Sequence, residues 1–200
     1  MDNENIIKPS DYKLSVSGCD LYYGDFHALK NVSLNIAPNE VTAFIGPSGC
    51  GKTTILRLLS GLLAPDGGQV IRDRRLRYSF LFQEDRLLPW AGALKNLTAV
   101  GIPPTAAREA LAQVGLSAEE AALPDSLSGG MRRRLAIARA AAYGGDYFFL
   151  DEPLRGLDEA TALRALDCLR GAMRGKGALL ITHNPEEARL LADEVIELSE

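Results

Sequence analysis

The chain has 200 residues, 46% of them hydrophobic, which is enough for one domain with a sizeable core. Its 22 basic and 26 acidic residues give a net charge of −4, so general attraction to nucleic acid or anionic lipid is not expected. No apolar run approaches the roughly 18 residues that a membrane-spanning helix needs. Cys19, Cys50 and Cys168 show no paired spacing, which argues against a disulfide framework and a zinc site. We expect a soluble, cytoplasmic protein that is still able to dock on a membrane protein.

The first part of the chain predicts three short strands, at 12–17, 32–36 and 40–45, with turns at 23–25 and 37–39 between them. The last strand leads into a glycine-rich loop, GPSGCGKTT, and an apolar helical pattern follows. A strand, a glycine-rich turn and a helix are the setting that a phosphate-binding loop requires.

The loop spans 46–54, and its residue types suit phosphate binding. Glycines let the backbone adopt positive φ and bring N–H groups to phosphate oxygens, and the helix start adds a positive dipole end. Lys52 can then reach the β- and γ-phosphates, while Thr53 ligates the Mg²⁺ between them. The alternative is a plain turn between a strand and a helix. The expected phosphate contacts are Gly46, Ser48, Gly49, Cys50, Gly51, Lys52, Thr53 and Thr54.

Beyond the loop, a turn at 65–68 and a strand at 76–82 are expected. From 84 to 127 apolar residues recur at helical spacing and β-branched residues become rare, which predicts a small inserted helical subdomain. A helix at 131–142 follows, with one apolar face and a solvated face formed by the arginines at 132–134.

The rest of the chain alternates strands with helices: strands at 147–150, 178–182 and 194–198, and helices at 159–173 and 186–192. This alternation predicts an α/β fold with a mostly parallel sheet covered on both faces. We expect one domain, 1–200, with its core at 1–83 and 128–200 and the helical subdomain at 84–127.

Polar residues stand where three of the apolar strands end. Asp151 and Glu152 follow one strand, Gln83 a second and His183 a third. Ligands bind at the carboxyl ends of strands in open α/β sheets. We expect Asp151 to hold Mg²⁺ and Glu152 to act on the attacking water as general base or positioner. Gln83 would contact the Mg²⁺ or the water, and His183 the γ-phosphate. The alternatives are an acidic pair that only ends a strand, and polar residues with purely structural roles.

The segment Leu127-Ser128-Gly129-Gly130 precedes a predicted helix. A serine and two glycines at a helix N-terminus can bind an anion through backbone N–H groups. By themselves these residues are equally well explained as a helix cap.

Taken in order, these motifs resemble those of the ATP-binding cassette (ABC) ATPases, the motor subunits of ABC transporters. The resemblance implies ATP hydrolysis with ATP and Mg²⁺ as ligands, on a P-loop core with a mostly parallel sheet, a small antiparallel β edge and an inserted helical subdomain. The matching stretches, similar to the Walker A, Q-loop, signature, Walker B, D-loop and switch histidine of the family, are 46–54, Gln83, 127–130, 147–152, 157–158 and His183.

The resemblance also implies partners. Two cassettes would form a dimer around two nucleotides, with Ser128, Gly129 and Gly130 binding the γ-phosphate held by the other subunit, and Asp158 also near nucleotide. Tyr23 matches the aromatic residue that stacks on adenine, with packing on the sheet edge as its alternative. A transmembrane permease and a periplasmic or lipoprotein solute-binding protein complete such a system, which places the cassette on the inner face of the membrane; no nucleic acid is expected.

Two pairs of stretches resemble different importer groups. Residues 22–31 and 41–45 look like the phosphate-importer ATPase, whereas 82–90 and 129–131 look like the nitrate, sulfonate and taurine importer group. We favour the second group, because the region after Gln83 faces the permease in the family. A phosphate-importer ATPase and a non-transport ABC ATPase remain alternatives. The signature disfavours a small kinase or GTPase.

An apolar cluster, Leu87-Leu88-Pro89-Trp90, follows Gln83 and holds the only tryptophan of the chain. Pro89 disfavours a continuous helix or strand, and the preceding residues are charged. An apolar patch beside charges is typical of an interface, and in the resembling family this surface receives a short permease helix. The alternative is burial in the core of the cassette.

Overall fold

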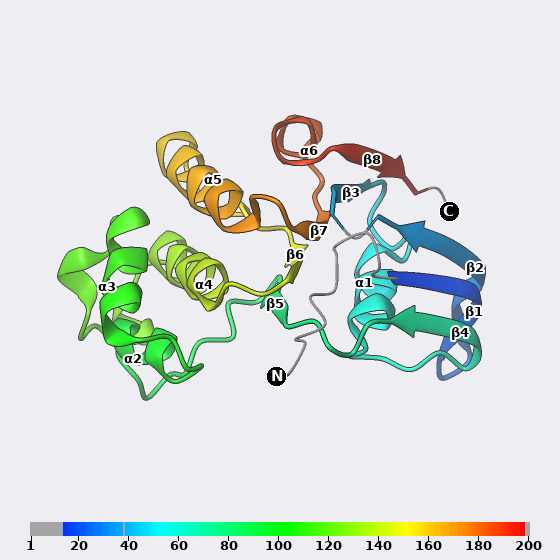
Figure 1. The fold of residues 1–200 in the computed structure, drawn as a ribbon, viewed down its shortest axis with the longest axis horizontal. Helices are drawn as coiled ribbons and strands as arrows, with labels where there is room; N and C mark the ends of the chain where they lie inside the picture. The colour runs from blue at the N-terminus through cyan, green and yellow to red at the C-terminus, as the bar shows by residue number, and fades with distance from the viewer. Residues whose placement is uncertain (1–13, 38, 199–200) are drawn as a thin grey trace, which may run out of the picture. The chain divides into compact units, whose positions relative to one another are not determined.

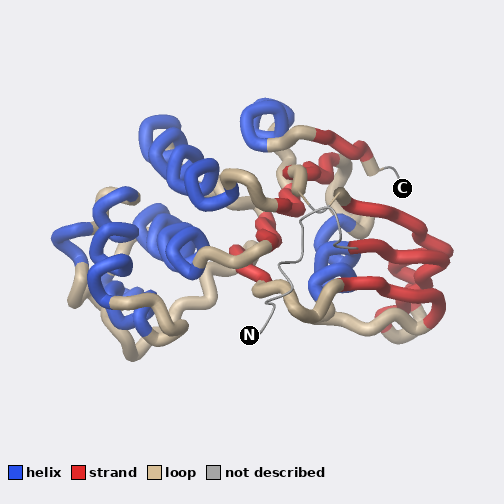
Figure 2. Tube along the Cα trace, in the orientation of Figure 1, coloured by secondary structure: helices blue, strands red, loops and turns tan. Residues whose placement is uncertain are grey.

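The computed structural model describes residues 14–37 and 39–198, which form two compact units (Figures 1 and 2). The first unit contains the residues up to Arg77 together with those from Gly175 onward, and the second is Tyr78–Arg174. Among the described residues, no helix has the length and apolarity that crossing a membrane requires. The predicted strand residues 12 and 13 and the predicted turn residue Pro38 lie outside the described part.

The first unit contains an antiparallel sheet in the order β2-β1-β4 (Figure 1). In it β1 (Leu14–Tyr23) pairs with β2 (Phe26–Ile36) on one side and with β4 (Gly67–Arg72) on the other. Both β1 and β2 are longer than predicted, because register shifts between them interrupt the alternation of apolar and polar residues. The β4 strand is missing from the sequence-based prediction, since it begins with two glycines and exposes half of its residues.

The first unit also contains three parallel strands, with β3 (Val41–Ile45) between β7 (Gly177–Ile181) and β8 (Glu194–Glu197). Helix α1 (Lys52–Ser60) contacts β1, β4 and β7, and α6 (Pro185–Leu191) contacts β3. All of β7 and nearly all of β3 are buried, as expected for parallel strands covered by helices. The glycine-rich loop therefore leaves this sheet at the carboxyl end of β3.

The second unit packs helices on two parallel strands, β5 (Tyr78–Leu81) and the fully buried β6 (Tyr147–Asp151). Its helices are α2 (Ala93–Thr98), α3 (Pro104–Gln113), α4 (Gly129–Tyr143) and α5 (Glu159–Met173), with short 3₁₀ turns at Ser117–Glu119 and Pro124–Ser126. Helix α4 contacts the other three helices and β5. The boundaries of the predicted helical subdomain stay a prediction; its helices α2 and α3 contact α4 within this one unit.

Candidate functional site

The glycine-rich loop has the backbone that phosphate binding requires. Gly46, Gly49 and Gly51 have φ values of 144°, 88° and 93°, which disfavour residues with a side chain. A Cβ on Gly51 would lie 2.7 Å from the Leu29 side chain, and one on Gly46 would collide with the carbonyl oxygen of Leu198. Torsion and close neighbours thus both require glycine in the loop, which ends where α1 begins. Phosphate binding by the loop stays a prediction.

The ammonium group of Lys52 is held by the loop itself. Only 5% of Lys52 is exposed. Its Nζ donates hydrogen bonds to the carbonyl oxygens of Gly46 at 2.9 Å and Pro47 at 2.6 Å, and lies 3.6 Å from the Cys50 sulfur. Two carbonyl oxygens of the loop therefore hold the positive charge of Lys52 at the loop before any ligand contributes.

His183 lies at the same edge of the sheet as the loop within the first unit. It follows β7, which runs parallel to β3, and its side chain is exposed. The turn that carries it is shaped by Thr182, whose buried hydroxyl donates to the Glu187 carboxylate at 2.6 Å and accepts from the Asn184 N–H at 3.0 Å. The hydrogen bond between Thr182 and Glu187 is missing from the sequence-based prediction. A threonine at the end of a buried strand would have indicated such a bond.

Tyr23 is also in the first unit, as the last residue of β1, and is 46% exposed. Its neighbour Tyr22 instead stacks on His27, with ring centroids 4.0 Å apart. Stacking of this half-exposed ring on adenine stays a prediction.

In the second unit the structure brings Gln83 and Glu152 together. The Gln83 amide donates to Glu152 Oε2 at 3.4 Å, and Arg155 donates to the same oxygen at 3.0 Å. Glu152 has φ of 49°, an unusual value for a residue with a side chain, directly after Asp151 ends β6. A carboxylate beside an amide, at the end of a parallel strand, is able to orient a water molecule.

Asp151 is 5% exposed. Among the residues that the structure describes, no three His, Cys, Asp or Glu side chains gather closely enough to hold a metal ion. Mg²⁺ commonly binds through one or two carboxylates together with phosphate oxygens and waters. Asp151 therefore fits such a shared site.

One expectation is wrong in this unit. Arg133, predicted to be solvated with its two neighbours, is only 4% exposed. Its guanidinium donates to backbone carbonyls of the turn after β6 and of the segment after β5. Three consecutive residues on a helix point in three directions about 100° apart, so at least one of them faces the core.

The signature segment and Asp158 both cap helices. Ser128 Oγ accepts the N–H of Met131 at 3.2 Å at the start of α4, and Asp158 accepts the N–H of Thr161 at 3.0 Å at the start of α5. Hydrogen bonds from Thr161 hold the pKa of Asp158 below its usual value. Ser128 and Gly129 are exposed and Gly130 is half-buried. The capping role is thus present, and binding of a nucleotide by these residues stays a prediction.

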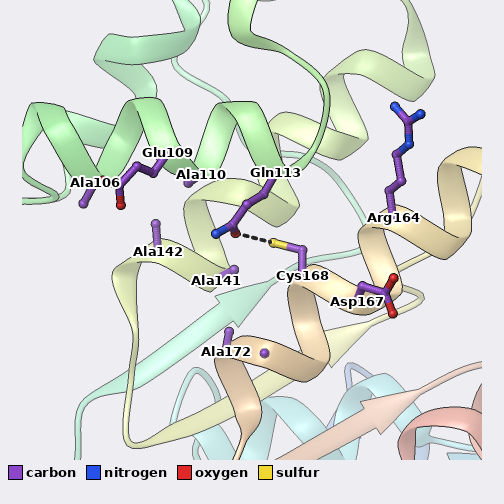
Figure 3. Close-up of a pocket in the computed structure, with 11 residues that line it drawn as sticks. Ala106, Glu109, Ala110, Gln113, Ala141, Ala142, Arg164, Asp167, Cys168 and Ala172 are labelled. Atoms are coloured by element: carbon purple, nitrogen blue, oxygen red, sulfur yellow. Dashed lines mark hydrogen bonds between the residues drawn. The ribbon is translucent and has the colours of Figure 1, made fainter.

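A groove of about 640 Å³ lies among α3, α4 and α5 (Figure 3). Small side chains form much of its wall, and the Cys168 thiol contacts Gln113 Oε1 at 3.6 Å. Burial raises the pKa of Cys168 to about 11, so this thiol stays protonated. None of the predicted nucleotide residues lines the groove, and it is therefore not the phosphate site.

Comparison with known proteins gives consistent matches. A family model described as ABC transporter matches residues 29–155, more than half of the chain. The aliphatic sulfonates import ATP-binding protein SsuB of Ralstonia nicotianae is 40% identical over 201 residues, which cover 95% of this chain and 70% of that protein. SsuB 3 of Paraburkholderia xenovorans is 41% identical over 199 residues, covering 96% and 79%.

Among solved structures, the ATP-binding cassette MJ0796, in a dimeric post-hydrolysis state bound to ADP and Pi, is similar with a TM-score of 0.83 and 29% identity. The match covers 92% of this chain and 94% of that one. The predicted α/β fold with parallel strands, a small antiparallel sheet and covering helices is confirmed. Because the family model, close relatives and a solved cassette agree over most of its length, this chain belongs to the ABC transporter family as one of its ATP-binding, ATP-hydrolysing cassettes.

Proposed function

We propose that this cassette powers the import of a small organic sulfonate through a separate membrane permease. The support is its identity of about 40% to proteins named for aliphatic sulfonate import, over nearly all of its own length. The segment after Gln83, which resembles the nitrate, sulfonate and taurine group, points the same way. Nothing in the comparisons favours the phosphate importer or a non-transport ABC protein.

The single observation that carries ATP hydrolysis at this site is the contact between the Gln83 amide and the Glu152 carboxylate. It joins the two groups that we assign to the attacking water. We propose that Glu152 is the general base or water positioner and that Gln83 contacts the water or Mg²⁺. Mg²⁺, when bound, supplies positive charge that stabilises the phosphates, and Asp151 and Thr53 would hold it.

The remaining proposed roles belong to nucleotide binding. Lys52 and the loop bind the β- and γ-phosphates: the loop already holds the Lys52 ammonium, and the backbone of a glycine-rich loop at a helix start offers N–H groups to phosphate oxygens. His183 contacts the γ-phosphate and Tyr23 stacks on adenine. Ser128, Gly129 and Gly130, with Asp158, act on nucleotide held by the second cassette of a dimer.

We further propose that the cassette lies on the inner face of the membrane and works with a solute-binding protein. Reconstitution tests this assignment: the cassette, its permease and the binding protein in sealed vesicles should take up a labelled alkanesulfonate when ATP is supplied. We expect uptake of the sulfonate to exceed that of phosphate and nitrate by about tenfold or more, since one lost anion contact costs on that order. Uptake of phosphate alone would transfer the assignment to the phosphate importer.

We propose Leu87, Leu88 and Trp90 as the permease docking patch. Trp90 is 77% exposed and the leucines are half-buried. The segment owes its shape to Asn96, fully buried on α2, which accepts the Leu88 N–H at 2.7 Å and donates to the Ala91 carbonyl at 2.7 Å. An apolar ring that a buried amide holds out toward solvent fits a partner surface.

Replacing Trp90 and Leu87 with alanine should weaken permease binding by about tenfold or more, because exposed aromatic residues are frequent interface anchors. Basal ATP hydrolysis should stay within about twofold of that of the unmodified chain. The loss in free energy of unfolding should be far below the about 3–5 kcal/mol that truncation of a buried aromatic costs, so the melting temperature should fall little. Pull-down titrations and calorimetry measure both effects. Leu123→Ala, another exposed apolar residue of the same unit, is the matched control. Unchanged permease binding would remove the docking assignment.

A further inference from the structure

The Arg133 guanidinium on α4 donates hydrogen bonds to three backbone carbonyls around Glu152. Its Nε donates to the Pro153 carbonyl at 2.9 Å, and its Nη2 donates to the carbonyls of Asp151 at 2.9 Å and Glu152 at 2.6 Å. Three consecutive carbonyl oxygens therefore converge on one planar group. Such a fixed fork constrains backbone orientation more tightly than a single hydrogen bond does.

These hydrogen bonds flank a residue with an unfavourable backbone torsion. Glu152 has φ of 49°, in the left-handed region that residues with a Cβ disfavour. The carbonyls of Asp151 and Glu152 flank this torsion, and both accept from the same Nη2. Relaxation of the torsion would rotate a carbonyl away from the guanidinium. Arg133 thus opposes a backbone change that would re-aim the Glu152 carboxylate.

The same guanidinium also holds the segment after β5. Its Nη1 donates to the Phe82 carbonyl at 2.6 Å and lies within reach of the Gln83 carbonyl at 3.4 Å and the Asp85 carboxylate at 3.3 Å. One side chain therefore ties the backbone of Gln83 to the backbone of Glu152. This link keeps the two backbones close, and the side chains of Gln83 and Glu152 meet at 3.4 Å.

A buried arginine needs compensation for its lost hydration, and this one has it. Burial lowers the pKa of Arg133, while the nearby carboxylate of Asp85 raises it. The carbonyls supply the acceptors that water would otherwise supply. An apolar residue of similar volume would fill the same space but would leave these carbonyls without their donor.

We propose that Arg133 is a positioning residue for ATP hydrolysis, which holds Gln83 and Glu152 in one arrangement through their backbones. This inference rests on the proposed roles of Gln83 and Glu152 and adds the element that places them.

The test compares Arg133→Met with Arg139→Met in the full chain. Arg139 is the matched control, because it lies on the same helix and its guanidinium donates to the carbonyls of Asp85 and Arg86, both at 2.8 Å. For Arg133→Met we expect kcat to fall by about tenfold to a hundredfold, as misplacement by about 1 Å does, with the KM for ATP within about twofold. Arg139→Met should keep kcat within about twofold.

Rescue by a conservative variant separates positioning from general stability. Arg133→Lys keeps the charge and part of the donor set, so its kcat should lie between those of the unmodified chain and Arg133→Met. If Arg133→Met does not fold, the comparison of Arg133→Lys with Arg139→Lys carries the test, with a kcat loss expected only for the first. A kcat within about twofold of the unmodified chain, or a KM that rises as much as kcat falls, would overturn the proposal.

Introducing Arg133→Met into a chain that already carries Glu152→Gln distinguishes failure of this inference from failure of the proposed role of Glu152. In single-turnover measurements, Arg133→Met should add less than about threefold to the loss already caused by Glu152→Gln, because both changes act on the same group. If Arg133→Met lowers the rate as much in the Glu152→Gln chain as in the unmodified chain, Arg133 does not act through Glu152. That result would overturn the positioning role and leave the proposed role of Glu152 intact. Near-normal turnover by Glu152→Gln itself would instead remove the proposed role of Glu152, and the inference with it.

Discussion

Replacing Glu152 with glutamine should lower kcat for ATP hydrolysis by about 10²- to 10⁴-fold, the range that general acid–base groups contribute. The substitution keeps the size of the side chain, and its amide is still able to meet Gln83. The backbone contacts with Arg133 do not involve the side chain at all. The loss should therefore come from the missing carboxylate, rather than from a displaced turn.

ATP binding should survive this change, because Lys52 and the glycine loop lie in the first unit and do not depend on the carboxylate. The variant should accumulate as an ATP-bound dimer, since binding proceeds while turnover stops. Nucleotide titration and size-exclusion chromatography with and without ATP measure these two outcomes. Glu84→Gln, an exposed acidic residue of the same unit, is the control. ATP turnover close to normal in purified Glu152→Gln would contradict the role of Glu152 as general base or water positioner.

A one-to-one mixture of Lys52→Ala and Ser128→Arg chains should recover activity that neither parent has. If Ser128 acts on nucleotide held by the partner, each heterodimer contains one site with an intact Lys52 and an intact Ser128. With random pairing about half of the dimers are heterodimers and each has one working site of two, so about a quarter of the normal rate is expected. A role of Ser128 on its own nucleotide predicts no recovery.

The structure accommodates the Ser128→Arg substitution without burying the new side chain. Ser128 is exposed, so an arginine there can point to solvent, although loss of the cap of α4 costs about 1 kcal/mol. Ser126→Arg, two residues earlier at another exposed position, controls for added bulk and charge. The measurement is steady-state phosphate release over a range of mixing ratios. A mixture as inactive as both parents, in an assay that detects a tenth of the normal rate, would contradict action across the dimer.

Local sequence patterns were sufficient to predict the conformation of the glycine-rich loop and the buried strands. Positive φ at Gly46, Gly49 and Gly51 and burial throughout β6 follow from residue types that sit next to one another in the chain. Patterns failed for β4, whose pairing partner β1 lies about 50 residues earlier in the chain, because an exposed edge strand with two glycines has no apolar alternation.

The sequence by itself determined which residues the proposed chemistry uses: Lys52 in the glycine-rich loop, and the polar residues that end the strands. Only the tertiary structure decided how some residues are placed. It buried Arg133 among carbonyls 18 to 51 positions away, and it left Trp90 exposed on a segment held by Asn96. The physical reason is range: a turn or a helix start depends on neighbouring residues, whereas burial of a polar side chain depends on which distant backbone groups still need a hydrogen-bond partner.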